Sequence, residues 1–132
     1  MSYVQDIKVT LPIWIKSGKK KRYLNLNQYR NWHFQVSNNI KKTFKEQVGG
    51  NLDFSILGEI EIEYVYYAPD KRKRDLMNVI AVADKFFQDA LVEYGCIETD
   101  DTDTVVKITS LFGGVDKEDA RIIATIKQFK TT

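Results

Sequence analysis

A strictly alternating segment that runs directly into a long amphipathic one constrains the fold of this chain most. Residues 55–67 alternate acidic and apolar side chains through Glu59-Ile60-Glu61-Ile62-Glu63, which is the period of a strand with one buried and one wetted face. The three glutamates are therefore expected on the wetted face. After Ala68-Pro69, apolar residues recur at helical spacing from about Asp75 to Tyr94, and Gly95 ends the run. The sequence predicts a strand, a short loop and a helix in succession.

The N-terminal half predicts one more strand and one more helix. Residues 5–15 are rich in β-branched side chains and are expected to form a strand that ends near Pro12, followed by a flexible cationic loop over 16–22. The helical period returns at Leu26 and continues to Val48, just before Gly49-Gly50. This period predicts a single continuous helix.

The C-terminal third predicts two strands. Residues 105–109 and 121–126 have the composition of strands, and Gly113-Gly114 and a charged stretch lie between them, so the two are expected to pair antiparallel. The order β-α-β-α-β-β predicts one α+β domain of two layers over residues 1–132. Its sheet, mixed or antiparallel, is expected to have about four strands, with two main helices on one face.

The composition fits one soluble domain and narrows the chemistry. Hydrophobic residues make up 43% of the chain and charged residues 29%, and no apolar run reaches the roughly 18 residues of a membrane span. No secretory signal opens the chain, and the one cysteine, Cys96, cannot form an internal disulfide, which suits a reducing cytoplasm. The single histidine, His33, excludes most zinc sites and histidine triads. Without a glycine-rich phosphate loop, no nucleotide cofactor is expected.

Charge is distributed unevenly along the chain. Residues 1–74 carry 14 Lys and Arg against 7 Asp and Glu, whereas residues 75–132 carry 6 against 11. A basic half beside an acidic half suits a phosphate-binding surface that borders a metal-binding pocket, and chance segregation of solvated charges is the alternative. The candidate phosphate-binding cations form two runs, Lys19, Lys20, Lys21 and Arg22 in the first and Lys71, Arg72, Lys73 and Arg74 in the second.

Carboxylates at both ends of the second predicted helix are candidate metal ligands. Asp75 opens the helix, and Asp100-Asp101 follows it. If the chain folds back so that these ends meet, two or three carboxylates can hold Mg²⁺, which prefers oxygen ligands, with Mn²⁺ as the alternative ion. Two simpler interpretations stay open: Asp75 only favours the helix dipole, and Asp100–Asp103 is a plain turn. Asp89 lies 14 residues after Asp75, about 21 Å along a helix, so these two cannot share one ion within one chain.

Four motifs in this order resemble the RusA family of Holliday junction resolvases. They are Arg74-Asp75-Leu76-Met77-Asn78, Lys85-Phe86-Phe87-Gln88-Asp89-Ala90-Leu91, Gly95 and Asp100-Asp101. Two further segments, 25–30 and 114–118, are similar to versions of the family carried by phages and prophages of Gram-positive bacteria. The resemblance covers most of the chain and is strongest over 66–105.

The resemblance implies a small homodimer that cuts four-way and other branched DNA with paired nicks in a bacterial cytoplasm, because two matched cuts suit a two-fold dimer. It also implies Mg²⁺ as the cofactor. By position, Asp75 and Asp101 match the family's first and last metal-binding aspartates, with Asp100 as a further candidate ligand. Lys85 matches its catalytic lysine by its spacing to the Asp-Ala-Leu motif.

Met77 departs from the family pattern, because it stands where the middle metal-binding aspartate is expected and a thioether is a poor Mg²⁺ ligand. Asp100, Asp103 or Asn78 are candidates for the missing oxygen, and Asn78 and Asp89 are candidate supporting residues. The departure favours a second hypothesis, a protein that binds branched or double-stranded DNA with weak or lost nuclease activity. A third hypothesis is a structural phage protein without a nucleic-acid role.

Overall fold

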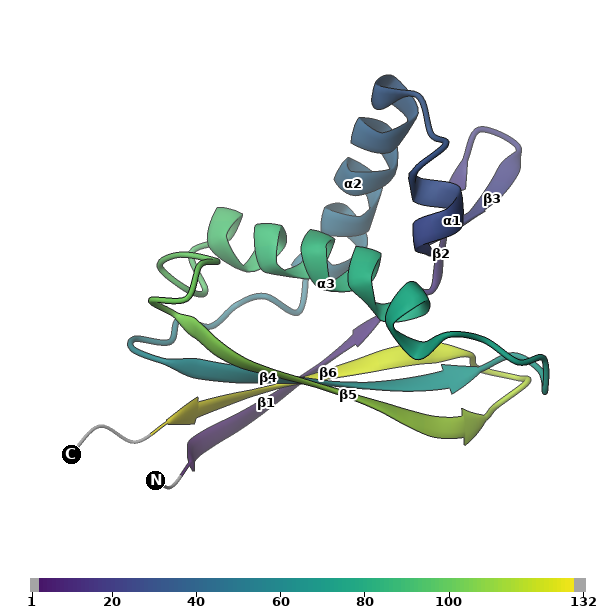
Figure 1. Ribbon diagram of the computed structural model, residues 1–132. Helices are drawn as coiled ribbons and strands as arrows, with labels where there is room; N and C mark the ends of the chain where they lie inside the picture. Colours follow the sequence, from purple (N-terminus) through teal and green to yellow (C-terminus); the bar gives the residue numbers. More distant parts are fainter. Residues whose placement is uncertain (1–2, 130–132) are drawn as a thin grey trace.

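A four-stranded sheet with helices on one face forms the body of the protein (Figure 1). The computed structural model describes residues 3–129. The elements are β1 (Tyr3–Leu11), β2 (Trp14–Ser17), β3 (Lys20–Tyr23), α1 (Leu26–Tyr29), α2 (Phe34–Gly49), β4 (Ile60–Ala68), α3 (Leu76–Glu93), β5 (Val105–Val115) and β6 (Arg121–Phe129). The strands of the sheet lie in the order β1-β6-β4-β5, and β2 and β3 form a separate hairpin.

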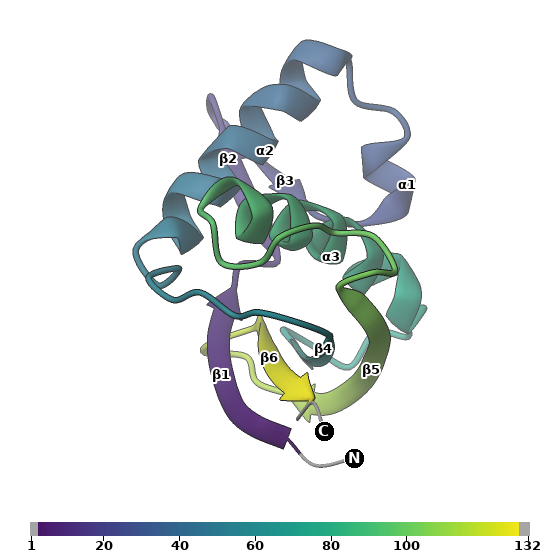
Figure 2. The same cartoon turned by 90° about the vertical axis from the view of Figure 1, so that its left-hand side faces the viewer.

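The two main helices confirm the expected α+β architecture. α3 runs across the four-stranded sheet. α2 packs against the β2–β3 hairpin and against the side of α3 that faces away from this sheet (Figure 2). The ring of Phe86 on α3 meets Phe44 of α2 edge-on at 5.7 Å, and Phe87 meets Tyr64 of β4 at 6.4 Å. Burying each such side chain contributes roughly 1.5–3 kcal/mol to the free energy of folding. α3 therefore stabilises the packing of α2 above it and of the sheet below it. Within residues 3–129, no helix is long and apolar enough to cross a membrane.

β4 confirms the alternating strand but corrects one expectation about its glutamates. Glu59 is exposed, whereas Glu61 is only 3% exposed. Its carboxylate accepts a hydrogen bond of 2.7 Å from the hydroxyl of Thr109 on β5 and lies 3.9 Å from the ammonium of Lys107. The prediction of a fully wetted face is wrong at Glu61, because neighbouring strands supply partners that satisfy a buried carboxylate.

The N-terminal half differs from the prediction at two breaks. The expected strand over 5–15 is two strands, since β1 ends at Leu11 before Pro12, which has no backbone N–H to donate to a ladder. The expected flexible loop over 16–22 is instead the β2–β3 hairpin, which turns at Gly18 with a φ of 62°. The expected single helix is broken into α1 and α2, because the His33 side chain caps α2 by accepting the N–H of Gln35 at 3.2 Å.

The C-terminal strands do not pair with each other as expected. β5 instead pairs parallel with β4, and β6 lies between β1 and β4, antiparallel to both. The reason is the crossover through α3, which carries the chain back to the end of the sheet where β4 begins, so that Ile60 pairs with Val105. The resulting sheet is mixed, and α3 connects its two parallel strands.

Candidate nucleic-acid interface

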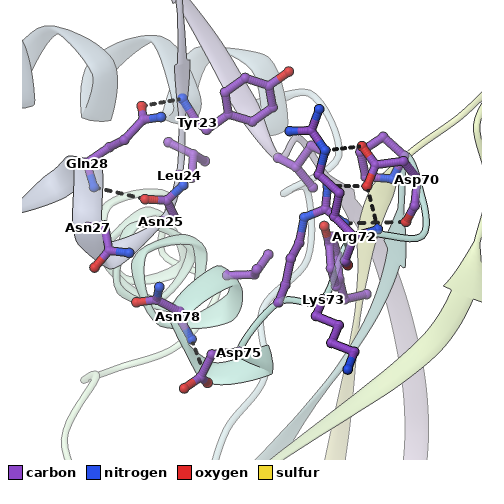
Figure 3. A pocket seen from close by; sticks show the side chains of 15 residues that line it. Tyr23, Leu24, Asn25, Asn27, Gln28, Asp70, Arg72, Lys73, Asp75 and Asn78 are labelled. Atoms are coloured by element: carbon purple, nitrogen blue, oxygen red, sulfur yellow. Dashed lines mark hydrogen bonds and ion pairs between the residues drawn. The ribbon is translucent and has the colours of Figure 1, made fainter.

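A hollow of about 710 Å³ opens beside the loop that joins β4 to α3. Figure 3 shows Asn27, Asn78 and Asp75 along one side of it, and Arg72 and Lys73 along the other. The lining comes from three segments that are distant in sequence: the end of the hairpin with α1, the 70–74 loop, and the first turn of α3. The hollow therefore combines cations, side-chain amides and two carboxylates, Asp70 and Asp75.

Asp70 holds the 70–74 loop in shape. Its carboxylate accepts the backbone N–H of Arg72 at 3.0 Å and the guanidinium of Arg74 at 2.7 Å. These two donors, the Arg72 N–H first, lower the pKa of Asp70 below its ordinary value. Arg74 also donates to the backbone carbonyls of Asp70 and Arg72, at 3.4 and 3.1 Å. Arg74 was expected to contact phosphate, but its guanidinium nitrogens form hydrogen bonds within the loop.

The remaining cations of the loop point outward. Lys71, Arg72 and Lys73 are exposed, and the side chain of Arg72 is 85% exposed, with its Nε 3.9 Å from the Asp70 carboxylate. No bidentate geometry engages Arg72, so its planar fork of donors is available to a phosphate. The loop thus offers three solvent-facing charges on a backbone whose shape is fixed from within.

The cations of the hairpin flank the hollow without lining it. Lys19, Lys20 and Lys21 are exposed, and the ammonium of Lys21 lies 4.4 Å from the ring centroid of Trp14. Arg22 is half-buried, and among residues 3–129 its Nε finds no hydrogen-bond partner. Lys19 and Lys20, next to the turn, are the hairpin residues best suited to a phosphate contact at a distance from the hollow.

Asp75 is the N-cap of α3 and also lines the hollow. Its Oδ1 accepts the backbone N–H groups of Met77 at 3.1 Å and of Asn78 at 3.4 Å, two of the donors that a helix start leaves unsatisfied. The simpler interpretation of Asp75, a residue that favours the helix start, is therefore correct. One carboxylate oxygen keeps this role while the side chain as a whole stays exposed.

Replacing Asp75 by alanine should lower the free energy of unfolding by about 1 kcal/mol, because the first turn of α3 loses its cap. Asp75→Asn should retain most of that stability, since the asparagine oxygen accepts the same bonds. Denaturant unfolding followed by circular dichroism measures both. Equal losses for the two variants would show that the charge of Asp75, not its capping oxygen, stabilises the helix.

Met77 is half-exposed, at 51%, and does not line the hollow. It lies on the first turn of α3, outside the core. A carboxylate placed at this position would therefore be tolerated by the fold, but nothing among the residues around the hollow directs it toward Asp75. Met77, which stands where the family pattern has an aspartate, is therefore a surface residue.

Asp101 organises the turn that leads into β5. Its carboxylate accepts the Thr99 hydroxyl at 2.8 Å and the Asp103 N–H at 3.0 Å, and its carbonyl accepts the N–H groups of Thr104 and Val105. The Thr99 hydroxyl, followed by the Asp103 N–H, lowers the pKa of Asp101 below its ordinary value. The 99–104 segment is thus a closed turn, in agreement with the simpler interpretation of Asp100–Asp103.

Removing the Thr99 hydroxyl should raise the pKa of Asp101 toward its ordinary value. A carboxylate whose folded pKa is lowered stabilises the native state above the unfolded pKa, and this contribution disappears as the pH falls through the folded pKa. Thr99→Ala should therefore lower the stability of the native state most near neutral pH, and the difference between the two proteins should disappear as the pH falls below the folded pKa of Asp101 in the wild type. An NMR titration of the Asp101 carboxyl carbon in both proteins checks the shift, and an unchanged midpoint would assign the low pKa to the backbone donors alone.

The structure does not bring the expected metal ligands together within one chain. Asp75 stands at the start of α3, and Asp100 and Asp101 follow its end; 18 helical residues separate the two places by about 27 Å. The sheet shows the same separation. Asp75 follows the end of β4 at Ala68, whereas Asp101 precedes Val105, which pairs with Ile60 at the start of β4. Across residues 3–129, no group of three His, Cys, Asp or Glu side chains could hold a metal ion. The expected fold-back is wrong, and one chain does not fit a Mg²⁺ site.

Lys85 and Asp89 are engaged between helices and lie away from the hollow. The ammonium of Lys85 lies 5.5 Å from the ring centroid of Tyr29 on α1. The Asp89 carboxylate pairs with the ammonium of Lys41 on α2 at 2.5 Å. The expected catalytic role of Lys85 has no carboxylate of the hollow beside it, since ten residues of helix, about 15 Å, separate it from Asp75. Asp89, expected as a supporting residue, joins α2 to α3 through this ion pair.

Side-chain amides from the N-cap and body of α1 are lining residues that the sequence did not predict. Asn25 caps α1 by accepting the N–H of Gln28 at 2.9 Å, and Gln28 in turn accepts the N–H of Tyr23 at 3.2 Å. These bonds fix the wall from which Asn27 faces the hollow (Figure 3). A capping signal was readable at Asn25, but only the packing of α1 on α3 places it opposite the 70–74 loop.

This arrangement suits a polyanion that also carries hydrogen-bonding groups. Exposed Lys and Arg bind phosphates, and Asn and Gln side chains both donate to and accept from the edges of nucleobases. The two carboxylates of the hollow already have partners within the chain: Asp75 caps α3, and Asp70 binds Arg74. Models of known protein families and curated proteins were compared with the chain, and none matches it.

Proposed function

We propose that this protein binds branched DNA with the 70–74 loop and the hollow beside it. The observation that supports this most is the pairing of Asp70 with Arg74, which fixes the loop while Lys71, Arg72 and Lys73 face solvent. A preorganised cationic loop loses little conformational freedom on binding, so more of the phosphate interaction appears as affinity.

The hollow supplies the part of the proposal that concerns branched DNA. A continuous duplex presents its phosphates on a convex surface, whereas the strands that diverge at a branch expose base edges and change direction. The loop cations would hold the phosphates next to the branch, and Asn27 and Asn78 would face the exposed base edges. The resemblance to the RusA family supports the same class of substrate.

Fluorescence anisotropy with a labelled four-way junction and a linear duplex of the same length and composition tests this function. Binding should favour the junction at equal salt, and the logarithm of the association constant should fall linearly with the logarithm of the salt concentration. EDTA should not abolish binding, because the contacts come from cations and amides of the chain. Absence of salt-sensitive binding to either DNA would overturn the proposal.

A second candidate function is Mg²⁺-dependent cutting of the junction by two chains together. The observation that favours two chains is the placement of Asp75 and Asp101 at opposite ends of α3. Two copies that lie side by side in opposite directions bring the Asp75 end of one to the Asp101 end of the other. A single chain lacks this arrangement, so binding without cutting is the activity that one copy supports.

Incubating the same labelled junction with Mg²⁺, Mn²⁺ or EDTA separates the two functions, since only the second produces nicks. If cutting occurs, Asp101→Asn should abolish it and leave junction binding intact. Asp84→Asn, which changes a carboxylate on the far side of α3 hydrogen-bonded by Tyr64 and Gln88, is the control that should keep cutting. Nicking that continues unchanged in Asp101→Asn would remove Asp101 from the site.

A further inference from the structure

A second hollow, of about 610 Å³, adjoins the first at the 70–74 loop. The two hollows share Tyr66 and most of the loop, and they differ in the rest of their lining. Beyond Tyr66 and the loop, the second hollow is lined by four apolar residues, Ala68, Leu76, Phe112 and Val115. This apolar hollow lies where the ends of β4 and β5 meet the loop, since Ala68 pairs with Val115 (Figure 1).

Phe112 is the most exposed of these apolar residues. It is 59% exposed, whereas Tyr66, its partner across the two strands, is 3% exposed. The two ring centroids lie 6.1 Å apart at an interplanar angle of 51°, so the buried ring contacts the exposed one at a tilt and does not stack flat on it. α3 contacts β4 further along, where Phe87 meets Tyr64. An aromatic face beside the loop is therefore open to solvent.

The apolar hollow combines this ring with cations. Lys71, Arg72 and Lys73 are exposed and also line it. A nucleotide carries the matching groups, because its phosphate is anionic and its base has a π face on which aromatic rings stack. Side-chain amides line the first hollow, but within residues 3–129 none lines the apolar hollow. The apolar hollow therefore suits the face of a base, whereas the first hollow suits its edge.

We propose that the apolar hollow accepts one nucleobase that has left its stack at the branch, and that Phe112 lies against the face of this base. The inference rests on the proposed binding of branched DNA and adds a contact that distinguishes a branch from a continuous duplex. Removing a base from a continuous duplex breaks its stacking on both faces, whereas a base at an open branch has already lost a neighbour. Stacking on an aromatic ring therefore compensates the loss more readily at a branch.

The shared cations favour a base of the bound DNA over a segment of another protein. Arg72 and Lys73 line both hollows. An acidic peptide that placed an aromatic side chain beside Phe112 would occupy these cations and compete with the DNA phosphates. A base of the DNA strand avoids this competition, because its own phosphate stays on the loop.

Anisotropy titrations with the four-way junction and the matched linear duplex test the role of the ring. Phe112→Leu keeps an apolar side chain but removes the π face, so it should lower the affinity for the junction by roughly 10-fold and change that for the duplex little. Phe112→Trp should bind the junction at least as tightly as the wild type. Leu111→Ala is the matched control and should bind as the wild type does, since Leu111 is 46% exposed but lines neither hollow. Circular dichroism verifies that all three variants fold.

Junctions that lack one base identify the partner of the ring. An abasic site is placed at each nucleotide next to the branch in turn. At one or more positions it should weaken binding of the wild type by roughly 10-fold and leave binding of Phe112→Leu almost unchanged, because both changes remove the same contact. Equal effects on the two proteins at every position would overturn the proposal.

The wild-type protein decides the proposed function, and the Phe112 variants decide the inference. If the wild type does not bind the junction, the function fails and the inference fails with it. If the wild type binds with the expected salt dependence but Phe112→Leu binds equally well, only the inference is overturned. A labelled peptide of four aspartates and a C-terminal phenylalanine is the last probe. If its binding requires Phe112 while junction binding does not, the apolar hollow accepts a protein segment, which also overturns the inference.

Discussion

Replacing Lys71, Arg72 and Lys73 together by alanine is expected to remove most of the affinity for a four-way junction. Each phosphate contact contributes about 0.9 to the slope of log affinity against log salt, so the triple variant should bind with a slope less steep by roughly 2 to 3. At low salt, the affinity itself should fall by roughly 100-fold. Arg74 stays in place, because its guanidinium closes the loop through Asp70 and its loss would change the loop's shape. Anisotropy titrations at several salt concentrations give both quantities.

A second triple variant controls for the loss of net charge. Lys8, Lys42 and Lys117 are exposed lysines on β1, on α2 and in the turn before β6, and all three lie away from the hollow. Their replacement by alanine removes the same charge and should leave the slope almost unchanged. If both triple variants lose the same affinity, binding depends on the overall charge of the protein and the loop has no special role.

Replacing Gly113 by alanine is expected to destabilise the protein by about 1–3 kcal/mol. A Cβ at this position would lie 2.6 Å from Cε1 of the Tyr67 ring and 2.8 Å from a methyl group of Val65. The ring cannot move away freely, because the guanidinium of Arg121 lies on it at 4.3 Å from the centroid. Glycine is therefore required here by close approach, at the point where the register of β4 and β5 shifts. Thermal or denaturant unfolding measures the loss.

A double variant distinguishes this clash from a change in backbone freedom. Tyr67→Ala removes the ring that a Cβ at position 113 would meet, so Gly113→Ala should cost much less stability in that background. Gly50, with open space around it, is the control glycine, and Gly50→Ala should change stability little. Equal costs of Gly113→Ala with and without the Tyr67 ring would contradict the packing explanation.

The central unit of the fold was predictable because its signals are local. The alternation that defines β4, the apolar period of α3 and the cap at Asp75 all depend on neighbours within a few residues, and each lies where the sequence predicts it. The β2–β3 hairpin was missed because five cations in seven residues favour a loop, while the pairing of Trp14 with Tyr23 depends on packing.

The candidate site was predictable in part for the same reason. The sequence marked the 70–74 cations and Asp75, which lie together because they are consecutive. It could not show that Arg74 turns inward to Asp70, or that Asn27 arrives from α1. The expected meeting of Asp75 with Asp101 failed because a parallel crossover through an 18-residue helix carries the chain to the far end of the sheet. Only the strand order decides that distance, and strand order is not a local property.

An NMR titration of the ¹⁵N-labelled protein with a four-way junction tests most directly whether the 70–74 loop and its hollow bind branched DNA. The largest amide shifts should fall on residues 70–78 and on the 23–28 wall of the hollow, and they should diminish as salt is added. The exposed face of α2, around Lys42, should remain unshifted and serves as the internal reference. Shifts confined to α2 or to the open face of the sheet, or no shifts at all, would show that the 70–74 loop and its hollow do not bind the junction.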